Sequence, residues 1–366
     1  MSCVDGYGWR GTGARYVAGP LFSWPQGLDR RKVRDPINAF GHPATRSAVL
    51  MGCDGDVASR FGRYRESPIG WPVTLKSIFA EGFHMRRIQM VLLAAVAVLG
   101  SVIWSATPAV ANTAGPEPSY YLALGDSLSQ GVQPGSDGTN AETTNGYPDQ
   151  LYGTLVKSNP SLQLIKKGCP GETTTTMING GGPCVGQYTT GNQLADAVQF
   201  LQHHRGHVAD VTIDVGSNDV LNDQCVPNGS INTGCALSAI QTVRTNLDTI
   251  VRTLRGNLAG RTVRAAGMTY YDPLLALWPS PVASQSVFFT NLLNGVEAAT
   301  YLRNGFRVAP VAFAFQTNNF RIPPGSTDPV NVAQICALTF MCSKGNIHPT
   351  DDGYKLIATT FAQTLR

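Results

Sequence analysis

Several features that would point to other classes of protein are missing from this sequence of 366 residues. It has no C-x-x-C pair, so a zinc site built on closely spaced thiolates is not indicated. The glycine run at 180–182 lacks the Lys-Ser/Thr that completes a phosphate-binding loop. The main apolar run, residues 90–104, is shorter than the ~20 residues that a membrane-spanning helix needs. No internal repeat indicates a solenoid or a propeller.

Positive charge is concentrated in the first 111 residues. The whole chain is formally +4, yet residues 112–366 hold 15 Lys and Arg against 17 Asp and Glu, a net charge of −2. That part of the chain carries no basic patch of the kind that binds nucleic acid. We therefore expect no nucleic-acid partner.

The front of the chain divides into two segments. Residues 1–84 show no sustained period of 2 or 3.6, so we interpret them as a doubtful N-terminal extension, disordered or not translated. Residues 85–111 begin with Met-Arg-Arg, continue with the apolar run and end in Ala-Val-Ala, which is the pattern of a secretory signal peptide. We expect a secreted protein without a stable membrane span after processing, in which residues 112–366 form one large domain.

Cysteine usage agrees with export. The domain holds six cysteines, which allow fifteen pairings, but they fall into three pairs separated by 15, 10 and 6 residues. Each pair lies within one expected loop region, and closing such a short loop contributes on the order of 2–3 kcal/mol. We predict the disulfides Cys169–Cys184, Cys225–Cys235 and Cys336–Cys342.

Strands and helices are expected to alternate through the domain. Short apolar runs indicate strands, and apolar residues at helical spacing indicate helices. The expected strands are 121–124, 162–165, 208–215, 262–268 and 306–312, and the expected helices are 145–158, 193–203, 237–254, 287–302 and 350–364. Such alternation predicts an α/β fold with a parallel sheet that is covered on both faces.

Ser127 lies just past the first expected strand, where open α/β sheets place their chemistry. It follows Gly125 and Asp126, and the alternative to a nucleophile is an ordinary Gly-Asp-Ser turn. The segment is not the G-x-S-x-G elbow of α/β-hydrolases, because Ser129 stands where that motif needs glycine.

Two further strand ends carry groups that can hold an anion. In GCPGETT, the backbone amide at Gly171 could bind one. A loop braced by a disulfide would account for Cys169 but not for this glycine. In DVGSND, Asn218 could donate its side-chain amide to a developing oxyanion, and the alternative is a helix-capping asparagine.

His348, in the segment NIHPTDDGY, is the only histidine placed for general-base work. It directly precedes Pro349 and the last expected helix. His203, His204 and His207 lie at a polar helix end, and the other two histidines lie in the front of the chain.

Taken together, these four motifs resemble the GDSL or SGNH hydrolase family over residues 120–366. The cysteine pairs and the YYDP segment at 270–273 are similar to its secreted actinobacterial-type lipases and esterases. The resemblance implies a flavodoxin-like three-layer α/β/α sandwich that hydrolyses small-molecule or lipid carboxyl esters without a metal or cofactor, and we expect a monomer. Carried over by position, it makes Ser127 the nucleophile and His348 its base. The oxyanion hole would be the amides of Ser127 and Gly171 with the side chain of Asn218.

The sequence departs from the family at one place. The family usually has Asp three residues before the histidine, and that position is Gly345 here. A base must still be held in one tautomer and orientation. We expect a backbone carbonyl or Asn346 to hold His348, giving a Ser-His dyad, and we expect Asp351 and Asp352 to lie in the first turn of the last helix.

Two rival functions remain open. One is an esterase that removes acetyl groups from a polysaccharide or another polar ester. Leu277, Trp278, Phe288 and Phe289 could line an acyl groove, although residues at such spacings more often belong to the core. The other rival, suggested by the missing Asp, is a non-catalytic secreted binding protein on the same scaffold.

Overall fold

The computed structural model describes residues 117–258 and 262–366. The N-terminal extension, the expected signal peptide and Cys3 and Cys53 lie outside these residues. Within the two described ranges, no helix is both long and apolar enough to cross a membrane.

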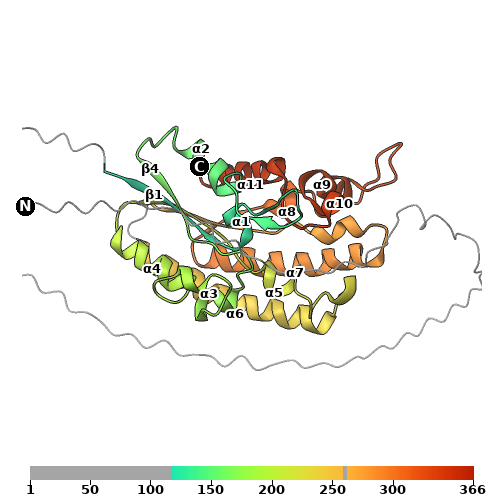
Figure 1. Ribbon diagram of the computed structural model, residues 1–366, viewed down its shortest axis with the longest axis horizontal. Helices are drawn as coiled ribbons and strands as arrows, with labels where there is room; N and C mark the ends of the chain where they lie inside the picture. Colours follow the sequence, from blue (N-terminus) through green and yellow to red (C-terminus); the bar gives the residue numbers. More distant parts are fainter. Residues whose placement is uncertain (1–116, 259–261) are drawn as a thin grey trace, which may run out of the picture. The chain divides into compact units, whose positions relative to one another are not determined.

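A five-stranded parallel sheet forms the centre of the domain (Figure 1). Its strands are β1 (Ser119–Gly125), β4 (Leu162–Lys166), β5 (Val208–Asp214), β6 (Arg264–Met268) and β7 (Arg307–Ala309). Their spatial order is β4-β1-β5-β6-β7, which is the 2-1-3-4-5 order of flavodoxin-like sheets when the five are counted alone. A separate small hairpin joins β2 (Gln133–Pro134) to β3 (Asn140–Ala141).

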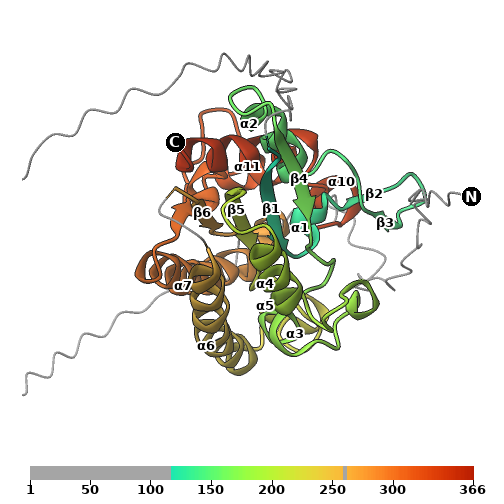
Figure 2. The same ribbon diagram turned by 90° about the vertical axis from the view of Figure 1, so that its left-hand side faces the viewer.

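Helices cover both faces of this sheet (Figures 1 and 2). On one face, α2 (Tyr147–Leu155) packs against α11 (Asp351–Thr364). The other face carries α4 (Gln193–His203), α6 (Thr233–Asn257) and α7 (Pro281–Arg303). The expected three-layer α/β/α sandwich is therefore confirmed.

Shorter helices occupy the connections. They are α1 (Ser127–Gln130), α3 (Thr174–Asn179), α5 (Ser217–Val220), α8 (Val311–Ala314), α9 (Val330–Leu338) and α10 (Met341–Lys344), with 3-10 turns η2 (Val185–Gln187), η3 (Pro227–Gly229) and η4 (Pro273–Leu277). α1 and α5 begin directly after β1 and β5, so the first turns of both lie at the carboxyl edge of the sheet.

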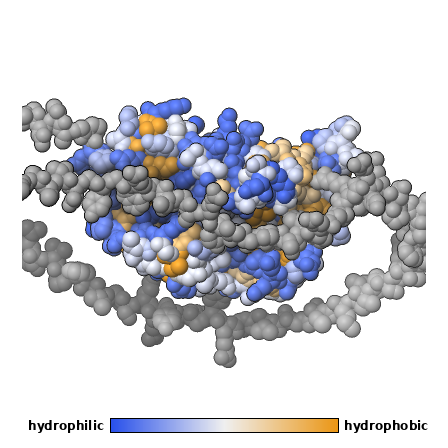
Figure 3. Space-filling model, viewed as in Figure 1, coloured by the Kyte–Doolittle hydropathy of each residue, from blue (hydrophilic) through white to orange (hydrophobic). Residues whose placement is uncertain are grey.

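The core lies between the sheet and its helices. β1 is hydrogen-bonded to a parallel neighbour on each side, and its residues 121–124 are completely buried. The predicted apolar stripe of α6, from Ile240 to Leu254, faces inward and is buried, as expected. On the face shown in Figure 3, most of the described surface is hydrophilic and apolar residues gather in small patches.

Among the expected elements, the last strand and the helix expected over 287–302 differ most from the structure. The strand expected over 306–312 stops at Ala309, because Pro310 has no N–H to donate to a neighbouring strand, and the chain turns into α8. α7 begins six residues before its expected start, with Ser280 as N-cap and Pro281 in the first turn. α9 and α10 were not expected, because the apolar residues of VNVAQICAL show no clear helical stripe.

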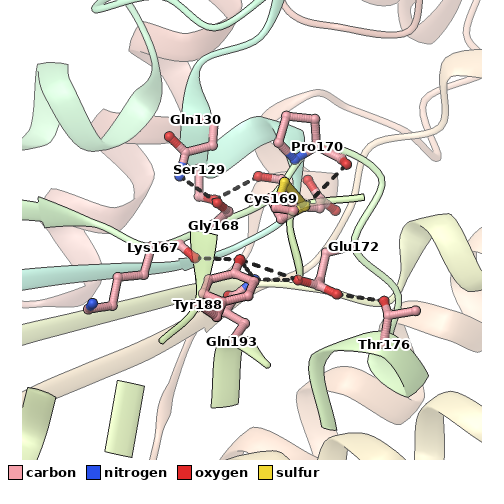
Figure 4. The surroundings of a disulfide bond; sticks show 12 residues. Ser129, Gln130, Lys167, Gly168, Cys169, Pro170, Glu172, Thr176, Tyr188 and Gln193 are labelled. Carbon is pink, nitrogen blue, oxygen red and sulfur yellow. Dashed lines mark hydrogen bonds between the residues drawn. A yellow bond between two sulfur atoms is a disulfide. The ribbon is translucent and has the colours of Figure 1, made fainter. Parts of the chain in front are cut away.

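All three predicted disulfides are present, Cys169–Cys184, Cys225–Cys235 and Cys336–Cys342. The first braces the loop between β4 and α3 beside the end of β1 (Figure 4).

Candidate active site

Ser127 is the first residue of α1 and follows a tight turn at the end of β1. Gly125 has φ +131°, and a Cβ there would lie 2.0 Å from the carbonyl oxygen of Asp214, so only glycine fits. The Asp126 side chain caps the helix by accepting a hydrogen bond from the amide of Leu128 at 2.9 Å. As a first-turn group, the amide of Ser127 has no acceptor within its own helix.

Buried polar groups hold this turn in place. The Tyr270 hydroxyl donates to Asp126 Oδ2 at 2.9 Å, and the Asp126 amide donates to the Asp214 carbonyl at 2.9 Å. The Tyr147 hydroxyl donates to Asp214 Oδ1 at 2.6 Å. Burial raises the pKa of both carboxyls, and the charge of Asp126 raises the pKa of Asp214 further. Buried hydrogen bonds of Tyr270, Tyr147 and Asp214 therefore hold the nucleophile turn in place.

Gly171 lies in a tight turn that contacts the end of β1. The Glu172 amide donates to the Cys169 carbonyl at 3.0 Å, and Gly171 has φ +82°. Pro170 followed by glycine at positive φ is the signature of a type II turn. The Cys169 amide donates to the Gly125 carbonyl at 3.0 Å, which brings this loop beside the nucleophile turn.

Asn218 lies in α5, after β5, and reaches toward the same loop. Its Nδ2 donates to the Glu172 carbonyl at 3.0 Å, and because an amide carries two donors, one N–H remains for a ligand. Gly216, not Asn218, is the N-cap of α5, so the capping alternative is wrong. Asp219 accepts from the amide and the hydroxyl of Thr174, and burial raises its pKa to about 6.

His348 is buried, and its Nδ1 lies 2.8 Å from Asn346 Oδ1. Two further bonds fix the orientation of the Asn346 amide. Its Oδ1 accepts from the His348 backbone amide at 3.0 Å, and its Nδ2 donates to Asn140 Oδ1 at 2.8 Å. Because an amide oxygen can only accept, Nδ1 carries the ring proton and Nε2 has a free lone pair. Burial lowers the pKa of His348 to about 4, so the ring is neutral at neutral pH.

Tyr271 connects the surroundings of Ser127 and His348. Its side chain lines the pocket that contains Ser127, and its hydroxyl donates to the Ile347 carbonyl at 2.7 Å. Among the described residues no hydrogen bond joins Ser127 to His348. In enzymes without substrate such a bond is often long, and it tightens only in the complex.

The two acidic residues after His348 are exposed in the first turn of α11, as expected. Asp351 Oδ1 accepts from Gln133 Nε2 at 2.9 Å. Asn346 therefore occupies the place at Nδ1 that a carboxylate holds in a triad.

A pocket opens beside Ser127 and adjoins a larger, mainly apolar one. The two share Ser217, Leu221, Tyr270, Tyr271 and Pro273. The larger pocket lies between η4, α7 and the region of the Cys225–Cys235 disulfide, and its apolar walls include Val226, Leu274, Phe289 and Leu293. Of the four aromatic and aliphatic residues named from sequence for an acyl groove, Phe289 lines it, whereas Phe288 is exposed.

Sequence reasoning missed Asn140 and Gln193, which hold site groups from distant parts of the chain. Asn140 lies in β3 and orients Asn346, and Gln193 lies in α4 and binds the end of β1. Neither belongs to a motif, so only the fold could reveal their roles.

Comparison with known proteins identifies the family. The model of the GDSL-like Lipase/Acylhydrolase family matches residues 123–356. No curated protein is similar enough to this sequence to count as a match. Similar solved structures include an extracellular lipase from Streptomyces rimosus, with 18% identity, 67% of this chain and 99% of that chain covered, and a TM-score of 0.45. An acetylxylan esterase from Geobacillus stearothermophilus has 14% identity, covers 68% of this chain and 94% of that chain, and gives a TM-score of 0.39.

The family assignment rests on the matched model, which spans more than half of the chain and contains all four motifs. The chain belongs to the GDSL-like lipase/acylhydrolase family of carboxylic ester hydrolases.

Proposed function

We propose that this protein is a secreted serine hydrolase that cleaves carboxyl esters through an acyl-enzyme on Ser127. His348 Nε2 takes the hydroxyl proton as Ser127 Oγ attacks the ester carbonyl carbon. The amides of Ser127 and Gly171 and the Nδ2 of Asn218 bind the resulting oxyanion. The imidazolium then gives its proton to the leaving alcohol, and water repeats the sequence to release the acid.

One observation supports this role of His348 above all others, namely the fixed Asn346 amide at its Nδ1. It supplies from a neutral side chain the orientation that a triad obtains from a carboxylate. The low pKa makes Nε2 a weak base, but it also keeps nearly all of the enzyme in the neutral, base-competent form at neutral pH.

The larger apolar pocket, which adjoins the pocket beside Ser127, supports an acyl group longer than acetyl. Its apolar walls include Val, Leu and Phe side chains, and each methylene of an acyl chain buried against them contributes about 0.8 kcal/mol to binding. That gain corresponds to roughly fourfold in kcat/KM per methylene until the pocket is full.

A panel of p-nitrophenyl esters from acetyl upward tests this function on purified residues 112–366. We expect kcat/KM to rise with acyl length and then to level off, and Ser127→Ala to abolish turnover. Activity confined to acetyl esters would favour the rival acetylesterase. Absence of turnover with every ester would favour the binding protein.

Export is part of the proposal. Three disulfides are typical of proteins that mature in an oxidising compartment, and the sequence 85–111 has the pattern of a signal peptide. We expect mass spectrometry of the exported protein to find its first residue near Asn112. Peptides from residues 1–84 in the exported protein would contradict the proposal.

A further inference from the structure

The side chain of Gln193, the first residue of α4, hydrogen-bonds to the backbone at the end of β1. Its Oε1 accepts from the Gly125 amide at 2.7 Å, and its Nε2 donates to the Gly125 carbonyl at 2.9 Å. The side chain is fully buried, with an exposed fraction of 0%. Because Gly125 lies two residues before Ser127, this pair of hydrogen bonds fixes the backbone from which the nucleophile turn starts.

The same amide binds the loop that carries Gly171 (Figure 4). Gln193 Nε2 donates to Glu172 Oε2 at 2.8 Å and lies 3.2 Å from the Tyr188 hydroxyl. Thr176 donates to the other carboxylate oxygen of Glu172 at 2.5 Å, and the Tyr188 hydroxyl donates to the Lys167 carbonyl at 3.0 Å. Glu172 is buried, and neutral donors hold its carboxylate.

Glu172 is also tied to the oxyanion groups through its own backbone. Its amide closes the turn that contains Gly171, and its carbonyl holds Asn218 Nδ2 at 3.0 Å. A displacement of Glu172 would thus move the Gly171 amide and release the Asn218 side chain together. Through Gln193, this residue is connected to Gly125 and so to the nucleophile turn.

We propose that Gln193 and Glu172 are positioning residues that set the spacing between Ser127 and the oxyanion donors at Gly171 and Asn218. This inference rests on the proposed function of those groups. Gln193 and Glu172 contact the backbone that carries Ser127 and the oxyanion donors, so we expect them to affect the geometry of the transition state more than substrate binding. Misplacement of reacting groups by about 1 Å can cost roughly 10²-fold in rate.

The kinetic test compares Gln193→Ala and Gln193→Glu with Asn331→Ala. Asn331 is an equally buried amide that bonds the Thr317 carbonyl and no group of the site. We expect both Gln193 variants to lose roughly 10- to 100-fold in kcat, with KM changed less than about twofold. Gln193→Glu keeps the size of the side chain, but its carboxylate cannot donate to the Gly125 carbonyl and faces the carboxylate of Glu172. If Gln193→Ala lowered kcat only by leaving a cavity, Gln193→Glu would keep the wild-type kcat.

A double-mutant cycle distinguishes positioning from general loss of structure. If Gln193 acts through the oxyanion loop, Gln193→Ala will cost much less in an Asn218→Ala background than in the wild type. Full additivity of the two losses, or a kcat for either Gln193 variant equal to that of Asn331→Ala, overturns the proposal.

Hydrogen exchange at the Gly125 amide gives a readout that needs no activity. We expect faster exchange in Gln193→Ala than in Asn331→Ala, because the 2.7 Å bond from this amide is lost. If the wild-type protein hydrolyses no ester, the proposed function fails, yet hydrogen exchange still reports whether Gln193 holds the Gly125 backbone. If exchange at the Gly125 amide is the same in Gln193→Ala and in Asn331→Ala, the positioning role of Gln193 is refuted.

Discussion

The hydrogen bond between Asn346 and His348 can be tested by two substitutions at one position. Asn346→Ala removes the acceptor for both the Nδ1 proton and the backbone amide of His348. A buried donor left without a partner costs about 1–3 kcal/mol, which corresponds to roughly 5- to 150-fold when it falls on the transition state. We expect kcat to fall within that range.

Asn346→Asp adds a negative charge and keeps the size of the side chain and its acceptor at His348 Nδ1, but it loses the hydrogen bond to Asn140 Oδ1. A carboxylate beside an imidazole raises its pKa by about 1–3 units. The pKa of His348, lowered by burial to about 4, would therefore rise to roughly 5–7. Since the protonated ring cannot act as a base, the acid limb of kcat/KM should move up in pH by the same amount.

The assay is the pH dependence of p-nitrophenyl ester hydrolysis between pH 3 and 9 for the wild type and both variants. Ester turnover in the wild type should persist well below pH 6.5. A wild-type acid limb near 6.5, or an acid limb that does not move in Asn346→Asp, would refute the assigned environment of His348.

Three further predictions concern the proposed catalytic residues and the two acidic residues that follow His348. Ser127→Ala and His348→Ala should each remove nearly all turnover, and the double variant should lose no more activity than either single variant. Asn218→Ala should lower kcat by roughly 10²–10³-fold. Asp351→Asn and Asp352→Asn should change kcat only modestly, because both side chains are exposed; a loss of three orders of magnitude in either, with intact circular dichroism, would contradict the dyad. The buried neutral ring of His348 has a folded pKa below its unfolded value, so it should lower the free energy of unfolding as pH falls from 6.5 toward 4, by about 3 kcal/mol. In urea denaturation, the free energy of unfolding of His348→Gln should therefore fall less between pH 6.5 and 4 than that of the wild type.

The elements with strong periodicity could be predicted from sequence. The stripe of α6 and the buried run of β1 depend on local pattern alone, and the cysteine pairs could be inferred from short spacing. α8 could not, since the residues after Pro310 continue an apolar run that reads equally as strand.

The candidate site was partly predictable for a similar reason. Ser127, Gly171, Asn218 and His348 stand at strand ends in recognisable motifs, and Asn346 is a near neighbour of His348 in sequence. Gln193 is separated by 68 residues in sequence from Gly125, to whose backbone it hydrogen-bonds. Long-range contacts of this kind depend on strand order and on the placement of α4, which local sequence does not encode.

The most direct test of the central claim is to find the covalent intermediate. Purified protein would be treated with a fluorophosphonate, which phosphonylates an activated serine, and its peptides would be analysed by mass spectrometry. The proposed mechanism predicts one adduct, on the peptide that contains Ser127, and strongly reduced labelling in His348→Ala. Ester hydrolysis accompanied by labelling at another residue, or by none at Ser127, would contradict it.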